Sequence, residues 1–133
     1  MFKFWRSSVG MRIYVDGGVR KQHLGRQRRE EGAIAIVLES KKIVENVGMV
    51  TNNEAEYLAL IRALEIAISK GIENIEILSD SELVVRQVEG EYKVRKKELM
   101  PLYEKVMKLS TKFKSFKIEH ISREENPAGK LLE

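Results

Sequence analysis

Apolar and polar positions alternate at the spacing of strands in the first part of the chain. Residues 12–16 alternate in this way, and the pair Gly17-Gly18 is expected to end this strand. Residues 33–38 are apolar without a break, and residues 43–50 form another candidate strand after a short turn. Two strands joined by so short a connection are expected to pair as an antiparallel hairpin.

Beyond residue 50 the apolar positions recur mainly at the spacing of helices. The run Thr51-Asn52-Asn53 supplies helix-capping residues, and apolar residues then follow at intervals of three and four until Gly71. A later helix is predicted over residues 98–113, with Pro101 tolerable in its first turn. The remaining elements are a strand over residues 75–79, a helix over residues 82–88 and a strand over residues 116–120. The order β-β-β-α-β-α-α-β predicts an α/β fold with a mixed sheet, whose parallel strands are connected by crossover helices.

Acidic residues lie at the ends of two of the predicted strands. Asp16 ends the first strand, and Asp80 ends the strand over residues 75–79. If these strands are parallel neighbours, the two carboxylates lie side by side at the edge where open α/β sheets bind ligands. Glu56, in the first turn of the helix that leads to the second of them, would lie over the same place. A simpler interpretation stays open, because Asp80 or Ser81 could serve only as the cap of the next helix.

Grouped carboxylates of this kind suit a particular chemistry. They are hard oxygen ligands that bind Mg²⁺ or Mn²⁺, with water completing the shell. Without a cation the grouping is unfavourable, because each negative charge raises the pKa of the neighbouring carboxyl group. Two such ions about 3.5–4 Å apart can activate a water molecule and stabilise the leaving oxygen of a phosphoryl displacement. Metal-dependent phosphoryl displacement is therefore the candidate chemistry.

Length and composition place the chain among ordinary globular domains. It has 133 residues, of which 43% are hydrophobic and 33% charged, and this size suits one domain. Residues 11–133 are assigned to that domain, and residues 1–10 to an N-terminal arm of unknown role. The absence of cysteine excludes a disulfide framework and a thiolate zinc site. No apolar run approaches the roughly 18 residues of a membrane span, so we expect a cytoplasmic protein without a membrane partner. We also expect a monomer.

The net charge of +4 is modest evidence for a polyanionic partner. Its distribution is more informative, because basic residues crowd two predicted loops. The first loop holds Arg20, Lys21, Arg26, Arg28 and Arg29, and the second holds Lys93, Arg95, Lys96 and Lys97. Such loops would hold the backbone of a nucleic acid. The alternative, that these charges only solvate the surface, stays open.

The chain also carries four short motifs that span nearly everything from Met11 onward. They are Tyr14-Val15-Asp16-Gly17-Gly18, Thr51-Asn52-Asn53-Glu54-Ala55-Glu56-Tyr57, Leu78-Ser79-Asp80-Ser81-Glu82-Leu83-Val84 and Arg123-Glu124-Glu125-Asn126. In this order and spacing they resemble the type 1 ribonucleases H, in the short form without the basic protrusion. The resemblance implies a ribonuclease H-like fold, with a five-stranded mixed sheet flanked by helices. It also implies hydrolysis of the RNA strand of an RNA–DNA hybrid with two divalent ions, leaving 5′-phosphate and 3′-hydroxyl ends.

The resemblance assigns roles to individual residues. Three acids match the residues that bind metal and carry out catalysis: Asp16, Glu56 and Asp80. Thr51 and Asn52 match positions that bind a DNA phosphate. Asn52 and Asn53 match positions that contact the RNA strand, where an amide can donate to a 2′-hydroxyl or accept from it. Plain helix capping is the other interpretation of this run, and the remaining predicted substrate-binding residues are Gly17, Gly18, Lys93 and Arg95.

The chain departs from the family pattern near its end. Family members carry a fourth acid in the arrangement Asn-x-x-Ala-Asp, whereas this chain has Gly129 and Lys130 after Asn126. We expect Asn126 to substitute as a metal-binding and catalytic residue through its amide oxygen, with weaker binding of the second metal. The alternative function is a weakened or inactive module that binds nucleic acid. The chain also stops where the family's last helix would continue. Two expectations therefore stay open: the domain has this helix, or it lacks it.

A histidine in a nearby loop assists proton transfer or product release in the family. His120 is the candidate for this role in the present chain. Its alternation with Phe116 and Ile118 also fits a structural residue within the last strand, and His23 has no better claim.

Overall fold

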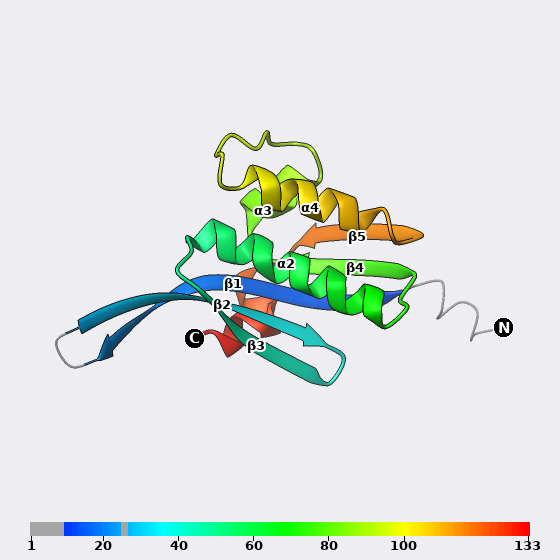
Figure 1. Ribbon diagram of the computed structural model, residues 1–133. Helices are drawn as coiled ribbons and strands as arrows, with labels where there is room; N and C mark the ends of the chain where they lie inside the picture. The colour runs from blue at the N-terminus through cyan, green and yellow to red at the C-terminus, as the bar shows by residue number, and fades with distance from the viewer. Residues whose placement is uncertain (1–9, 25–26) are drawn as a thin grey trace.

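The computed structural model of this protein describes residues 10–24 and 27–133, with side chains described outside residues 21–24 and 27–30. Its centre is a five-stranded sheet in the order β3-β2-β1-β4-β5 (Figure 1). The strands are β1 (Met11–Leu24), β2 (Gln27–Leu38), β3 (Lys41–Gly48), β4 (Asn74–Ser79) and β5 (Ser115–His120). The pairs β1–β2 and β2–β3 are antiparallel, whereas β1–β4 and β4–β5 are parallel. This mixed sheet confirms the predicted fold class, while residues 1–9 of the expected arm and Arg26 lie outside the described residues.

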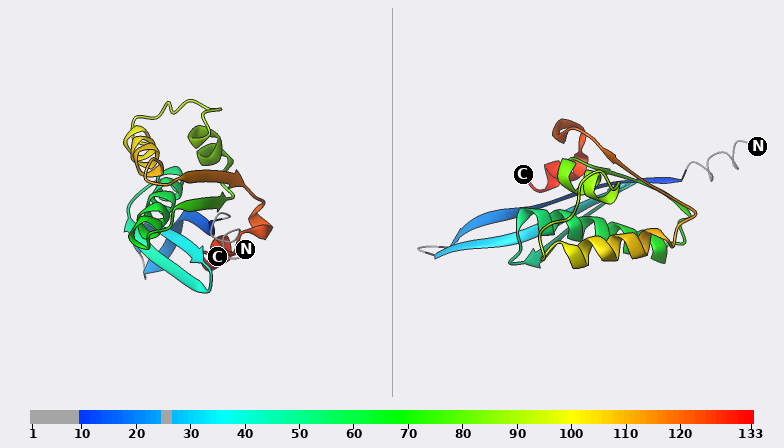
Figure 2. Two further views of the ribbon diagram at one scale, coloured as in Figure 1. Left: turned by 90° about the vertical axis from the view of Figure 1, so that its right-hand side faces the viewer. Right: turned by 90° about the horizontal axis from the view of Figure 1, so that it is seen from above.

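Helices cover the two faces of the sheet unequally. The long helices α2 (Asn52–Ser69) and α4 (Met100–Ser110) lie on one face, and the short helix α5 (Pro127–Leu131) lies on the other (Figure 2). The short helix α3 (Glu82–Val88) follows β4, and a 3₁₀ helix, η1 (Arg123–Glu125), precedes α5. The segment that follows β5, for which the sequence predicted no element, therefore contains two short helical elements.

Alternation along β1 sends its side chains to two separate clusters. Ile13 and Val15 are buried in the main core, which α2 and α4 complete. Tyr14 packs instead against a smaller cluster that includes Ala128 of α5. Because successive side chains of a strand point to opposite faces, Asp16 follows Tyr14 on the α5 side of the sheet.

Local capping explains where α2 and α3 begin. The hydroxyl of Thr51 accepts from the N–H of Glu54, and the carboxylate of Glu54 accepts from the N–H of Thr51, which makes a capping box. The hydroxyl of Ser81 accepts from the N–H of Val84 at the start of α3. Ser81 is therefore the cap of α3, and the carboxylate of Asp80 is available for another role.

The prediction that Gly17-Gly18 ends the first strand is wrong. β1 continues to Leu24 and β2 begins at Gln27, so most of the expected first basic loop is a two-stranded ladder. A Cβ on Gly17 would lie 2.3 Å from the carbonyl carbon and oxygen of Ala55. Gly17 is therefore required by the close packing of α2 on β1, rather than by a turn.

Candidate metal centre

Three carboxyl groups from distant parts of the chain meet where β4 ends. Val15 of β1 lies opposite Ser79 of β4 in the parallel ladder, so the next residue of each, Asp16 and Asp80, lies at the same edge. Glu56 comes from the beginning of α2, which packs over β1. One carboxylate oxygen from each acid lies within 4.8 Å of those from the other two. We call these three residues the acid cluster.

The backbone of Gly17 fixes one member of the acid cluster. Its N–H donates to Oε1 of Glu56. Since Gly17 also lets α2 approach β1, one glycine both admits the helix and holds the acid that the helix carries. Asp16 is itself only 3% exposed, so the cluster is closed toward the sheet.

Burial and mutual repulsion change the ionisation of the cluster. Burial raises the pKa of Glu56 to about 9, and the charge of Asp16 adds to the rise, while the hydrogen bond from Gly17 opposes it. Burial likewise raises the pKa of Asp16, with the charge of Asp80 as the second cause. At neutral pH the cluster without a cation therefore retains a proton on Glu56. A divalent cation would displace that proton, because metal ligands must be deprotonated.

The donor set fits a hard divalent cation. Three carboxylate oxygens within reach of one point match the preference of Mg²⁺ and Mn²⁺ for oxygen ligands. Arg123 forms only a weak ion pair with the acid cluster, because its Nη1 lies 3.9 Å from Oδ1 of Asp80 and its side chain is 63% exposed. Arg123 was given no role by the sequence, although it begins the motif that ends at Asn126. It nevertheless faces the cluster and lines the adjacent cavity.

Asn126 lies fully buried beside Asp80, with its amide already engaged. Its Nδ2 donates to Oδ2 of Asp80 at 2.9 Å and to the carbonyl of Val15 at 2.9 Å, and its Oδ1 accepts from the N–H of Ala128 at 3.0 Å. Two acceptors face Nδ2 and one donor faces Oδ1, so these partners determine the orientation of the amide. The oxygen points to the backbone of α5. This geometry makes Asn126 a positioning residue for Asp80 and does not support its predicted role as fourth ligand.

Gly129 is the residue of α5 that faces the acid cluster. A Cβ built on it would lie 3.5 Å from Oδ2 of Asp16 and 3.5 Å from Oδ2 of Asp80. Lys130, which stands next to it in the sequence, is exposed. The position from which a fourth acid could reach the cluster is therefore occupied by a residue without a side chain.

A cavity of about 380 Å³ opens beside the acid cluster. It is lined by Gly17, Gly18, Asn52 and Asn53, four of the predicted substrate-binding residues, together with Asp16 and Glu56. Oδ1 of Asn52 accepts from the N–H of Val19 at 2.9 Å, which ties the start of α2 to β1. The structure thus places these predicted residues around the same cavity as the acids.

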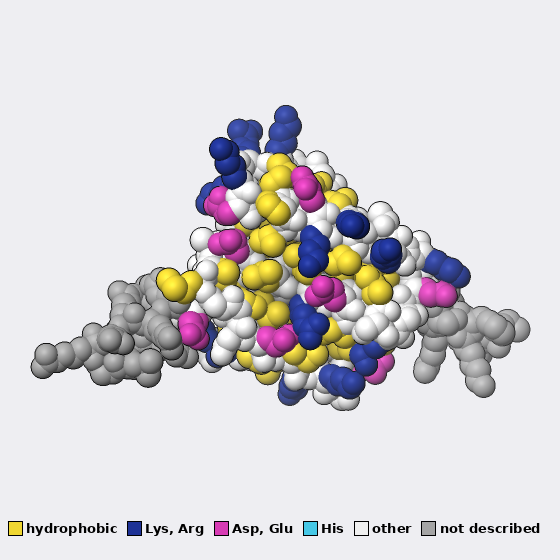
Figure 3. Space-filling model, viewed as in Figure 1, with side chains coloured by type: hydrophobic (Ala, Val, Ile, Leu, Met, Phe, Trp, Pro, Cys, Tyr) yellow, Lys and Arg dark blue, Asp and Glu magenta, His cyan; other side chains and the backbone are white. Residues whose placement is uncertain are grey.

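A smaller cavity of about 200 Å³ adjoins the start of α2. Thr51, Asn52 and Asn53 line it together with Lys96, which the sequence had placed only in a basic loop. Lys93 and Arg95 are exposed on the connector between α3 and α4 and line neither cavity. Figure 3 shows Lys and Arg side chains gathered at the top of the molecule, where this connector runs.

His120 is exposed at the end of β5 and lies away from this cavity. It lines a different cavity, together with Tyr14, Leu78 and Glu119. The structure therefore does not bring His120 to the cavity that adjoins the acid cluster, and its role in proton transfer stays a prediction.

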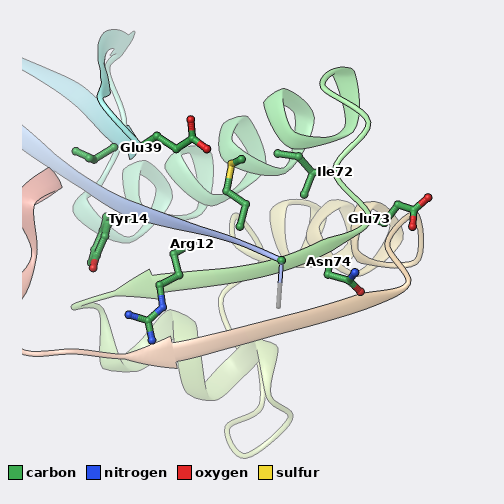
Figure 4. Close-up of a pocket in the computed structure, with 9 residues that line it drawn as sticks. Arg12, Tyr14, Glu39, Ile72, Glu73 and Asn74 are labelled. Carbon is green, nitrogen blue, oxygen red and sulfur yellow. The ribbon is translucent and has the colours of Figure 1, made fainter. Parts of the chain in front are cut away.

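A cavity of about 550 Å³, larger than the one beside the acid cluster, lies near the start of β1 (Figure 4). Arg12 and Tyr14 extend from one side of β1 in that view, and Ile72 lies on the other. Nε of Arg12 is paired with Oε1 of Glu76 at 2.9 Å. Among the described residues, the acid cluster is the one group of His, Asp and Glu side chains placed to share an ion. The size of a cavity alone therefore does not identify the candidate metal centre.

Relatives of known sequence place the chain in a family. Residues 25–132 match the family model described as reverse transcriptase-like. A bifunctional protein of Mycobacterium tuberculosis is 36% identical over 91 residues, which are 68% of this chain and 24% of that protein. The chain therefore spans about a quarter of the length of this relative.

Solved structures give the same result at the level of the fold. Ribonuclease H1 from the halophilic archaeon Halobacterium salinarum has a TM-score of 0.80 and 31% identity, covering 92% of each chain. LC11-RNase H1, solved in complex with an RNA/DNA hybrid, has a TM-score of 0.75 and 31% identity, covering 92% of this chain and 99% of that one. No helix in the described part of the chain is long and apolar enough to cross a membrane. The sequence motifs, the strand order and these similarities agree: the chain belongs to the reverse transcriptase-like family and, within it, to the type 1 ribonucleases H.

Proposed function

We propose that this protein is an endonuclease that hydrolyses the RNA strand of RNA–DNA hybrids with two divalent ions, Mg²⁺ or Mn²⁺, and leaves 5′-phosphate and 3′-hydroxyl ends. The observation that carries the proposal is the meeting of Asp16, Glu56 and Asp80 beside a cavity lined by Asn52 and Asn53. Family membership supports it, as does the hybrid bound to LC11-RNase H1.

The acid cluster would hold the ions, which when bound supply an activated water and stabilisation of the leaving oxygen. The protein's own contribution is to hold the carboxylates in place before the ions arrive. The N–H of Gly17 holds Glu56, and the amide of Asn126 holds Asp80. Partners of this kind orient metal ligands, and their loss typically lowers affinity or activity by about 10–100-fold.

The start of α2 would recognise the substrate. Because Oδ1 of Asn52 accepts from Val19, its Nδ2 remains a donor for a phosphate or a 2′-hydroxyl. Thr51 and Lys96 line the adjoining cavity, where a DNA phosphate would be attracted by the Lys96 ammonium group. Discrimination of RNA from DNA would come from the 2′-hydroxyl, which RNA alone offers.

The test is incubation of the protein with end-labelled RNA–DNA hybrid, double-stranded RNA and double-stranded DNA, each with Mg²⁺ or Mn²⁺. Cleavage of the RNA strand of the hybrid alone is expected. The substitution Asp16→Asn should abolish cleavage while hybrid binding stays measurable. Intact hybrid at high protein concentration, or equal cutting of all three duplexes, would refute the proposal.

A second candidate is a binding module of the same fold with little or no turnover. The observation that favours it is the absence of a side chain at Gly129, where a fourth acid could reach the cluster. Hybrid binding that is independent of metal, without cleavage under any of the conditions above, would support this candidate against the first.

A further inference from the structure

A long loop joins α3 to α4 at the top of the molecule in Figure 1. We call residues 89–99 of this loop the connector. It carries several basic side chains, and one of them, Lys96, lines the smaller cavity beside Thr51 and Asn52 at the start of α2. The position of the Lys96 ammonium group therefore depends on how the connector is held against the rest of the protein.

Backbone hydrogen bonds hold the two ends of the connector. At its start, the N–H of Glu91 donates to the carbonyl of Arg86 at 2.8 Å. At its end, Leu99 is 2% exposed, and its N–H donates to the carbonyl of Lys96 at 3.1 Å. Between these ends, residues 93–95 make no backbone–backbone hydrogen bond within the described part of the chain. The course of the middle of the connector therefore depends on side chains.

The side chain of Gln87 reaches this middle part from α3. It is only 4% exposed, and its Nε2 donates to the carbonyl of Lys93 at 3.5 Å, which is a long hydrogen bond. Its Oε1 accepts from the hydroxyl of Tyr57 at 2.6 Å. These two partners determine the orientation of the amide, because a backbone carbonyl can accept only from its nitrogen. Gln87 thus supplies a polar contact to the middle of the connector, while Val94 supplies an apolar contact with the main core.

Tyr57 ties Gln87 to the helix that carries Glu56. Tyr57 is the next residue of α2, and its side chain is fully buried. Burial raises the pKa of Tyr57, so its hydroxyl stays protonated and donates to Gln87. α3 itself begins with its cap Ser81, directly after Asp80. One buried hydrogen bond thus joins the helix that carries one acid of the cluster to the helix that follows another.

Folding stability alone does not account for a glutamine at this position. An apolar pair in place of Tyr57 and Gln87 would avoid two buried polar groups, and replacing both partners of a buried hydrogen bond by apolar groups of the same shape is nearly neutral. What the amide adds is a donor directed at the carbonyl of Lys93. The glutamine therefore serves the placement of the connector.

We propose that Gln87 is a positioning residue that acts through Lys96. Its amide holds the middle of the connector, so that the Lys96 ammonium group stays beside the start of α2 and attracts a phosphate of the substrate duplex. The inference rests on the proposed function for the identity of that duplex. Gln87 lines neither of the two cavities beside α2, so its effect is on substrate binding and not on the chemical step.

The test measures binding of a labelled hybrid and of double-stranded DNA by fluorescence anisotropy in EDTA, over a range of salt concentrations. Gln87→Leu should weaken binding about 3–10-fold at low salt and reduce the slope of log K against log salt by up to about 0.9, the share of one phosphate contact. Lys96→Gln should have the same effects. Gln87→Leu/Lys96→Gln should bind no more weakly than Lys96→Gln alone, since both changes remove the same contact. In cleavage assays of Gln87→Leu, KM should rise while kcat is unchanged.

A second variant separates positioning from folding. Gln87→Leu leaves the buried hydroxyl of Tyr57 without its acceptor, so it should lower the melting temperature. Tyr57→Phe/Gln87→Leu removes both partners and should recover most of that loss. Its affinity for both duplexes should stay as low as that of Gln87→Leu, because the donor to Lys93 is still missing. Ile36→Val, in the core on β2, is the control that lowers the melting temperature and binds like the wild type.

Three results would overturn the inference. Recovery of affinity together with melting temperature in Tyr57→Phe/Gln87→Leu would show that Gln87 serves folding alone. Additive losses in Gln87→Leu/Lys96→Gln, or wild-type binding by Lys96→Gln, would show that Gln87 does not act through Lys96. A wild type that binds the hybrid without cutting it would overturn the proposed function alone, since the anisotropy comparison requires no turnover. A wild type that binds neither duplex would overturn both.

Discussion

Nδ2 of Asn126 donates to Oδ2 of Asp80 at 2.9 Å, across a separation of 46 residues in the sequence. The same amide nitrogen donates to the carbonyl of Val15, 111 residues away. One fully buried side chain thus joins β1, the end of β4 and the start of α5 next to the acid cluster. Because a donor faces Asp80, the carboxylate is held in a defined orientation.

Replacing Asn126 by Asp should therefore weaken the protein rather than improve its metal site. The change removes the donor to Asp80 and to Val15 and places a fourth negative charge in a buried position. We expect a loss of about 1–3 kcal/mol in the free energy of unfolding in EDTA, measured by urea denaturation. Cleavage of a hybrid should fall by about 10–100-fold.

Asn46→Asp is the matched control, because Asn46 is exposed on β3 and the substitution adds the same charge. It should leave both quantities unchanged. A higher rate of cleavage in Asn126→Asp than in the wild type would show that position 126 acts as a metal ligand instead.

Gly129→Asp should couple the stability of the protein more strongly to divalent metal. The new carboxylate would lie against Asp16 and Asp80, so it should lower the melting temperature in EDTA through like-charge repulsion. With Mg²⁺ or Mn²⁺ it should increase the rise in melting temperature, because a tighter ligand of the native state stabilises it more. Differential scanning fluorimetry with and without metal measures both effects.

Two controls accompany this measurement. Gly129→Ala adds only a Cβ at ordinary contact distance, and Lys130→Asp adds a carboxylate on an exposed residue. Neither should increase the effect of the metal. If Lys130→Asp increases it and Gly129→Asp does not, the assignment of the facing position is wrong.

Gly17→Ala and Gly18→Ala should differ sharply although the residues are neighbours. A Cβ at position 17 meets the backbone of Ala55 at 2.3 Å, whereas one at position 18 has Oδ1 of Asn52 at 3.9 Å as its nearest contact. Gly17→Ala should lower the free energy of unfolding by about 1–3 kcal/mol or more, since α2 must move away from β1. Gly18→Ala should stay within about 0.5 kcal/mol of the wild type, as measured by urea denaturation. Equal stabilities would contradict the close packing of α2 on β1.

The metal-free protein should lose stability as pH rises above the usual range of a carboxyl group. The pKa of Glu56 is raised by burial from 4.5 to about 9, so the folded state binds more protons than the unfolded state between these values. The stabilising contribution is fully present below about pH 4.5 and is lost as pH rises toward about 9. Urea denaturation in EDTA across this window should show the decline.

The stability of the metal-free Glu56→Gln variant should decline less over this pH range. The substitution removes the carboxyl group of Glu56 and leaves the carboxyl group of Asp16, whose pKa is also raised. Glu104→Gln, a substitution on the exposed face of α4, should keep the decline of the wild type. The stabilisation by Mg²⁺ should instead grow with pH, since the cation replaces the proton on Glu56. A metal-free stability that does not change between about pH 5 and 9 in the wild type would contradict the raised pKa.

The order and type of nearly every element could be predicted from local sequence. The hydrophobic pattern identified β4, α3 and β5, because burial against a core imposes one characteristic spacing of apolar residues on a helix and another on a strand. The capping residues that begin at Thr51 located the start of α2, because a helix cap depends only on residues close together in the sequence. The sequence also identified Asp16, Glu56 and Asp80 as candidate metal ligands, because the motifs around them are short and contiguous.

Tertiary packing decided the features that depend on partners far away in the chain. Whether Gly17 ends a strand or lets a helix pack closely against the strand depends on the backbone of Ala55. Ala55 is not among the sequence neighbours of Gly17. The role of Asn126 depends on which groups face its amide, and these lie 46 and 111 residues away. The sequence alone thus indicated which acids meet in the candidate metal centre, through short local motifs. Only the folded chain decided what holds them, since hydrogen bonds and close contacts are set by distance in space.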